Sequence, residues 1–189
     1  MKTRIAHMNF KNGCDRIQII HYNKPIQYGL GGMATSKLFR ENVALVIRPD
    51  LLSKQVLFAS LAQCADGSAP RIEMELSIFY GIKQGSKMAR FIILHELGHY
   101  INNDLLIENM EKYDEERVNL ASDGFVADAE LRADAFAASF LGRDASVVAL
   151  HELKQHLSQF YDENAEYAEN ADLVLSEIDL RIVALGLML

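Results

Sequence analysis

The amino-acid sequence predicts an α+β fold, a small N-terminal mixed sheet with one helix followed by a helical part. Segments that are rich in Ile and Val, or that alternate, fall in the first 84 residues. From Ser86 onward apolar residues recur at helical spacing instead. Strands first and helices afterwards indicate α+β rather than a doubly wound sheet. With no linker or internal repeat, we expect one domain over residues 1–189, strand-rich over 1–84 and helical over 85–189.

Strand-like and helix-like segments can be told apart within the N-terminal part. The predicted strands are "RIQIIHY" (16–22), "NVALVIR" (42–48) and "RIEMELSIFYGI" (71–82). Segment 50–65 has apolar residues at helical spacing and ends before Asp66-Gly67, so we expect a helix there. The glycine-rich segment 28–36 lacks a nucleotide fingerprint and a P-loop lysine, which predicts a loop or turn.

Four helices are expected in the C-terminal part. Ser86 can cap a helix over about 87–102. A second helix is predicted from Val126 to Leu141, with Gly142 as its stop. The other two are expected at about 145–160 and 171–185. The last of them reads as a core helix, with an oligomer or partner surface as the alternative.

Composition and charge exclude several functional classes. Residues 1–107 carry 13 of the 19 Lys and Arg residues but 8 of the 26 acidic ones, so residues 108–189 are strongly acidic. This acidity and the lack of a basic cluster argue against nucleic acid or an anionic membrane as partner. The acidic stretch 108–130 predicts a solvated loop, with a lid that favours basic substrates as the alternative.

The apolar runs and the cysteines of the sequence predict where the protein is located. No run approaches the roughly 18 apolar residues of a membrane helix. The N-terminus has no apolar core of a secretory signal, which predicts a cytoplasmic protein without membrane insertion. Cys14 and Cys64 are expected to be reduced thiols. The sequence does not predict the oligomeric state.

The stretch "FIILHELGHYINND" (91–104) carries the clearest chemical pattern. On a helix His95 and His99 lie on one face, so two imidazole nitrogens can bind one metal ion, and Glu96 can act as a base on a water held there. The apolar "FIIL" disfavours the alternative, a surface helix with two solvated histidines. Gly98 indicates a close approach by another segment or by substrate beside His99, unless it is simply a tolerated helix glycine.

A catalytic zinc site needs a third protein ligand. The elongated motif would need glycine at 102 and histidine at 105, where this chain has Asn102 and Leu105. Asp104 falls beyond the expected helix end and is a weaker candidate. We predict Glu130 as the third ligand, with Asp134, one turn later, accepting a hydrogen bond from a ligating histidine. The alternative is that both carboxylates point to solvent.

With these residues in place, the sequence resembles a known group of zinc peptidases. The segments "IEMELSIFYGI", "ARFIILHELGHYI" and "ELRADAFAASFL" are similar to the ImmA/IrrE-type metallopeptidases, of the thermolysin-related clan whose third ligand is glutamate. "ELRADAFA" also resembles the membrane-bound CAAX-prenyl endopeptidase and HtpX group. The first resemblance implies a minimal thermolysin-like fold with His95, His99 and Glu130 as ligands and Glu96 as base. Arg132 stands where that family often has an acidic residue, and Asp134 where it often has Asn.

The expected function is a zinc-dependent endopeptidase with one catalytic Zn²⁺ and a cytoplasmic protein or peptide as substrate. The resemblance implies a regulatory role such as repressor cleavage. Strand 71–82 is the candidate for holding an extended substrate by backbone pairing. The alternatives are a catalytically silent zinc-bound regulatory module and a hydrolase of a non-peptide substrate. The oxyanion could be stabilised by any of four residues, Tyr161, Tyr167, His151 and His156.

Overall fold

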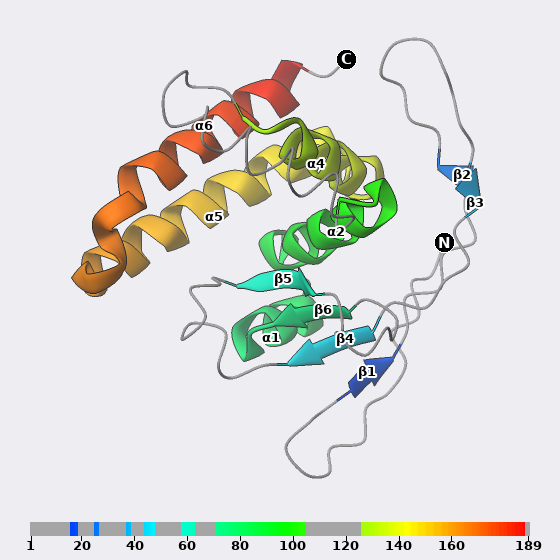
Figure 1. The fold of residues 1–189 in the computed structure, drawn as a ribbon, viewed down its shortest axis with the longest axis horizontal. Helices are drawn as coiled ribbons and strands as arrows, with labels where there is room; N and C mark the ends of the chain where they lie inside the picture. Colours follow the sequence, from blue (N-terminus) through cyan, green and yellow to red (C-terminus); the bar gives the residue numbers. More distant parts are fainter. Residues whose placement is uncertain are drawn as a thin grey trace.

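The structure, a computed structural model, has the predicted α+β architecture. Helix α2 (Lys87–Asn102) lies between a small sheet and the other long helices (Figure 1). It is therefore the central element, in contact with both layers. The described residues are 16–18, 25–26, 37–38, 44–47, 58–62, 71–104 and 126–187.

The main sheet has four strands in the order β1-β4-β6-β5. The strands are β1 (Arg16–Gln18), β4 (Ala44–Ile47), β5 (Ala59–Ala62) and β6 (Arg71–Met74). β4 and β6 run parallel, whereas β1 and β5 pair antiparallel with their neighbours, so the sheet is mixed as predicted. Two short strands, β2 (Pro25–Ile26) and β3 (Lys37–Leu38), form a separate antiparallel pair.

Two sequence predictions in this part are wrong. The helix expected over 50–65 is a strand where it is described, since residues 59–62 form β5. The strand expected over 71–82 ends at Met74 and is followed by helix α1 (Leu76–Gln84). Short apolar segments fit the periodicity of a helix and of a strand equally well. Here, pairing with β6 and packing against the core decide which of the two forms.

The strand proposed to hold substrate is also corrected. β6 lies between β4 and β5, so both of its backbone edges are already paired. β5 is the outer strand at this end of the sheet and lies against α2 (Figure 1). An extended peptide could therefore pair with β5 but not with β6.

The four C-terminal helices are confirmed. Ser86 caps α2, because its hydroxyl accepts a hydrogen bond from the Ala89 N–H. Gly142 ends the second helix as predicted. The remaining elements are α4 (Asp128–Leu141), α5 (Arg143–Glu163), the short 3-10 helix η2 (Ala165–Asn170) and α6 (Ala171–Leu187).

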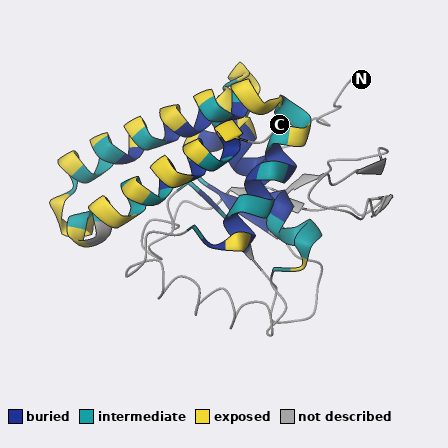
Figure 2. Cartoon of the chain, turned by 90° about the horizontal axis from the view of Figure 1, so that it is seen from above, coloured by how far each residue is buried: buried dark blue, intermediate teal, exposed yellow. Residues whose placement is uncertain are grey.

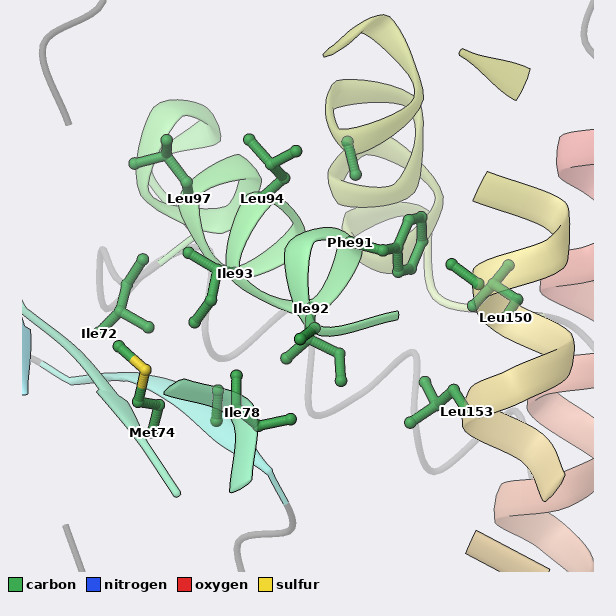
Figure 3. Packing of buried hydrophobic residues seen from close by; sticks show 14 of the residues in the cluster. Ile72, Met74, Ile78, Phe91, Ile92, Ile93, Leu94, Leu97, Leu150 and Leu153 are labelled. Atoms are coloured by element: carbon green, nitrogen blue, oxygen red, sulfur yellow. The ribbon is translucent and has the colours of Figure 1, made fainter. Parts of the chain in front are cut away.

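The hydrophobic core surrounds α2 and explains its central position. Side chains of the sheet and of α1 pack on one side of α2, and Leu150 and Leu153 of α5 lie on another (Figure 3). Consecutive residues of α2 from Phe91 to Leu94 are all buried, so no side of this stretch faces water. Each such apolar side chain stabilises the fold by about 1.5–3 kcal/mol. This packing carries His95, the next residue, into the interior.

Helix α6 is a core helix on one face only. Ile178, Arg181 and Leu185 are buried, whereas Val183 and Leu187 are exposed. Figure 2 shows exposed residues along the outward side of the long C-terminal helices. The prediction of a core helix is thus confirmed for the inner face. No helix among the described residues combines the length and apolarity required to cross a bilayer. Cys14, Cys64, segment 28–36 and most of the acidic stretch 108–130 lie outside the described residues.

Candidate metal centre

Helices α2 and α4 approach closely at a glycine. A Cβ atom at Gly98 would lie 2.8 Å from Ala133 Cα and 3.0 Å from Ala133 O, closer than such atoms can pack. The neighbouring atoms belong to backbone, which cannot rotate out of the way. The predicted close approach is therefore confirmed, and it brings the histidines of α2 beside the carboxylates of α4.

Three side chains converge where the two helices meet. His95 Nε2 and His99 Nε2 are 3.1 Å apart. Glu130 places one carboxylate oxygen 3.1 Å from His95 Nε2 and the other 3.4 Å from His99 Nε2. In a tetrahedral zinc site, bonds of about 2.0–2.1 Å put neighbouring ligand atoms about 3.3 Å apart. The spacing of the three groups therefore fits a single metal ion, which they could hold.

The carboxylates of α4 do not point to solvent. Glu130 is 7% exposed and Asp134 only 1%, so the alternative with solvated carboxylates is wrong. Burying two carboxylates one helical turn apart is costly unless cations compensate them. Each of them is indeed in contact with positively charged or proton-donating groups.

His95 is the centre of the first set of contacts, which we call the inner triplet (His95, Asp134 and Arg181). His95 Nδ1 lies 2.8 Å from Asp134 Oδ1, the predicted contact. Arg181 donates to both oxygens of Asp134, from Nε at 2.8 Å and from Nη2 at 2.7 Å. Its third nitrogen, Nη1, lies 3.3 Å from a Glu130 oxygen. The inner triplet thus links three helices at the predicted ligands.

Arg181 was not anticipated from the sequence. It lies on α6, far outside the segments that resemble known peptidases, yet its guanidinium is almost fully buried. The available signal was a lone cation within the apolar stretch "LRIVALGL", since a buried charge needs a partner. The sequence alone could not name that partner.

His99 has an equivalent set of contacts, which we call the outer triplet (His99, Asp104 and Arg132). His99 Nδ1 lies 2.9 Å from Asp104 Oδ2, and Arg132 Nη2 donates to Asp104 Oδ1 at 3.0 Å. Asp104 therefore contacts the nitrogen of His99 that faces away from the other histidine. Asp104 is therefore placed as a hydrogen-bond partner of His99 and not as a metal ligand.

The carboxylates and guanidinium groups shift the pKa values of the site. Burial lowers the pKa of His99, but Asp104 and Glu130 outweigh it and raise the value to about 10. Burial and Arg181 lower the pKa of His95, but Glu130 and Asp134 outweigh them, so the pKa of His95 is raised as well. Burial raises the pKa of Glu130, yet the two histidines and Arg181 hold it well below the usual range. The group therefore attracts positive charge.

The contacts of the ring nitrogens explain why the group attracts positive charge. Both histidines direct Nδ1 at a carboxylate, which favours a proton on Nδ1 and a lone pair on Nε2. The two lone pairs then face each other at 3.1 Å and repel unless a proton or a metal ion lies between them. A dication coordinated by both nitrogens and by Glu130 removes this repulsion.

Glu96 lies beside the three residues without joining them. One of its oxygens accepts a hydrogen bond of 2.8 Å from the Leu61 N–H of β5. Burial raises the pKa of Glu96, although His95 and His99 partly offset the effect. A carboxyl group with a raised pKa next to a metal position has the properties of a general base or acid.

The four candidates for oxyanion stabilisation have their described contacts elsewhere. His151 and His156 are exposed on α5. Tyr161 and Tyr167 pack against Phe160, and burial raises the pKa of Tyr161. None of these contacts involves His95, His99 or Glu130, the group that could hold a metal ion.

Comparisons with known proteins identify no relative. The chain matches no protein-family model, no curated protein and no solved structure.

Proposed function

We propose that the protein is a zinc-dependent endopeptidase. The observation that carries the proposal is the convergence of His95, His99 and Glu130, with Glu96 next to them. Two imidazoles and one carboxylate are a donor set that suits zinc and leave a position open for water. When bound, zinc would polarise the scissile carbonyl and lower the pKa of a water molecule.

Glu96 has the central chemical role in this proposal. Its carboxylate takes a proton from the attacking water and later passes it to the leaving amine. Glu130 and the two histidines fix the position at which the water and the carbonyl meet. Asp134 keeps the ring of His95 in the orientation that directs Nε2 at that position.

The edge of β5 supports a peptide as the substrate. Leu61 directs its N–H at Glu96, away from β6, so the outer edge of β5 runs alongside the proposed base. An extended peptide that paired with this edge would lie next to the metal-binding group. The substrate we propose is a protein in the cytoplasm, with a regulatory protein such as a repressor favoured by the ImmA/IrrE resemblance.

A silent metal-bound module is the second candidate. The position of Glu96 speaks against it, because a purely structural site has no need of a partly buried carboxylate with a raised pKa beside the metal. A hydrolase of a non-peptide substrate would use the same residues. The β5 edge favours the peptide.

Metal content and two substitutions test the proposal. We expect the purified protein to hold one zinc ion and Glu130→Ala to lose it. Glu96→Gln should keep the zinc and reduce peptide cleavage by about 10²–10⁴-fold. Asp179→Asn, in an exposed ion pair with Lys154, is the matched control and should change neither. Zinc that survives Glu130→Ala, or cleavage that survives Glu96→Gln, would contradict the proposal.

A further inference from the structure

We propose that Asp104 and Arg132 are positioning residues that hold His99 in the orientation required for metal binding. The inference rests on the metal centre of the proposed function but concerns residues that the sequence did not assign to it. It is carried by the turn after α2, by the two oxygens of Asp104 and by the anchoring of Arg132 on α4.

The turn after α2 returns Asp104 to the helix that it has just left. Asn103 adopts a left-handed conformation with φ of 59°, which Asn tolerates better than most residues. Its N–H donates to Tyr100 O at 3.1 Å, and the Asp104 N–H donates to His99 O at 3.0 Å. This pair of bonds is the Schellman motif. Backbone and side chain of Asp104 are thus both bound to His99.

Both carboxylate oxygens of Asp104 are engaged on the outer side of the histidine ring. Oδ2 accepts from His99 Nδ1 at 2.9 Å, and Oδ1 accepts from Arg132 Nη2 at 3.0 Å. The carboxylate is only 9% exposed. It lies at the opposite side of the imidazole ring from Nε2, the atom that faces Glu130. Asp104 can therefore orient His99 and select its tautomer, but it does not compete for the metal.

Arg132 connects this carboxylate to the helix that carries the third ligand. It lies two residues after Glu130 on α4, and its other nitrogen Nη1 is bound by Asp128 one turn earlier. The guanidinium is thereby held by its own helix while it binds Asp104 at the end of α2. The contact links the end of α2 to α4 and offsets the charge of Asp104.

The expected consequence concerns metal affinity. When Nδ1 donates its proton to Asp104, Nε2 keeps its lone pair for the metal. Loss of such a partner typically weakens metal binding by about 10–100-fold. Arg132 acts through Asp104, so its removal should also weaken metal binding, but by a smaller factor.

Zinc affinity, measured by competition with a chromogenic chelator, tests these roles. Asp104→Asn should weaken binding by about 10–100-fold. Arg132→Ala should weaken it less, and Arg132→Lys should recover part of that loss because it restores the positive charge. Co²⁺-loaded Asp104→Asn should show altered visible absorption bands, since the ring of His99 is no longer held. Asp179→Asn is again the control and should bind zinc like the wild type.

The outcomes separate this inference from the proposed function. A wild type that binds no zinc overturns the metal centre and the inference together. A wild type that binds zinc while Asp104→Asn binds it equally well, with unchanged Co²⁺ bands, overturns the inference alone.

A measurement on the unaltered protein covers the case of a variant that does not fold. In the zinc-loaded wild type, NMR should show the Nδ1 proton of His99 shifted downfield and slow to exchange with water, because Asp104 accepts it in a hydrogen bond. An Nδ1 proton that exchanges freely with water would overturn the inference without any substitution.

Discussion

The two histidines of the candidate metal centre, His95 and His99, each contact an aspartate that is paired with an arginine, but the two sets lie in different environments. In the inner triplet Asp134 and Arg181 are buried, and Arg181 comes from α6, 47 residues further along the chain than Asp134. In the outer triplet Asp104 follows His99 by five residues, and the side chain of Arg132 is 37% exposed. The inner support thus depends on tertiary packing, whereas the outer one depends largely on a local turn.

Because of this difference, the two triplets should contribute differently to the stability of the fold. A buried ion pair is expensive to break, because the remaining charge cannot reach water. The pair of Arg132 and Asp104 loses less, because water can take the place of the partly exposed Arg132 side chain and Asp104 keeps its contact with His99. Loss of Arg181 should therefore destabilise the whole fold. Loss of Arg132 should act mainly on His99 and hardly on global stability.

The largest effect is expected for the inner triplet. Arg181→Met would leave Asp134 buried with His95 as its remaining described partner. We expect the free energy of unfolding to fall by about 3–5 kcal/mol, measured by denaturant titration. The double variant Arg181→Met with Asp134→Leu should recover much of this loss, because neither charge then remains unpaired. A small effect of the single variant would remove the distinction between the triplets.

The contact between α2 and α4, on which both triplets depend, is expected to have the next largest effect. Gly98→Ala places a methyl group against the backbone of Ala133, so it should destabilise the fold by about 1–3 kcal/mol and weaken zinc binding. Gly186→Ala is the matched control, since a Cβ at that position on α6 meets no atom within 4 Å. The control should be neutral or stabilising. Equal stability of the two variants would show that the helices do not need this close approach.

The stability of the metal-free protein should depend on pH through His99 of the outer triplet. Asp104 and Glu130 raise the pKa of His99 to about 10, above its ordinary value of 6.5. Protonated His99 therefore stabilises the fold fully below pH 6.5, and this contribution is lost as the pH rises through about 10. Denaturant titrations across this range should show a smaller decline for His99→Gln than for the wild type. Parallel curves would contradict the raised pKa.

The smallest effect on stability is expected for the outer triplet. Arg132→Ala should lower the free energy of unfolding by only about 0.2–1 kcal/mol, because the side chain is partly exposed. The matched comparison is Lys154→Ala, which removes the more exposed ion pair with Asp179. A loss as large as that of Arg181→Met would mean that both triplets support the fold equally.

Several features could be predicted from the sequence because they depend on local periodicity. The spacing of His95 and His99, the cap at Ser86 and the apolar stretch before His95 all lie within one helix. Glu130 and Asp134 stood out because two carboxylates on an alanine-rich face need compensation. Gly98 indicated a close approach by a segment or a substrate, since glycine is otherwise unfavourable in a helix, and the structure shows that the approaching segment is α4.

The tertiary structure alone decided the rest. Segments 59–62 and 76–84 had apolar patterns that fit strand and helix alike, and strand pairing and core packing selected between them. The helix end after Asn102 was predicted, but the turn that returns Asp104 to His99 requires the left-handed conformation of Asn103. Arg181 reaches the site only because α6 packs beside α4 and α5. The periodicity of a sequence specifies which face of an element is apolar, whereas the partner of a buried charge depends on which elements meet in space.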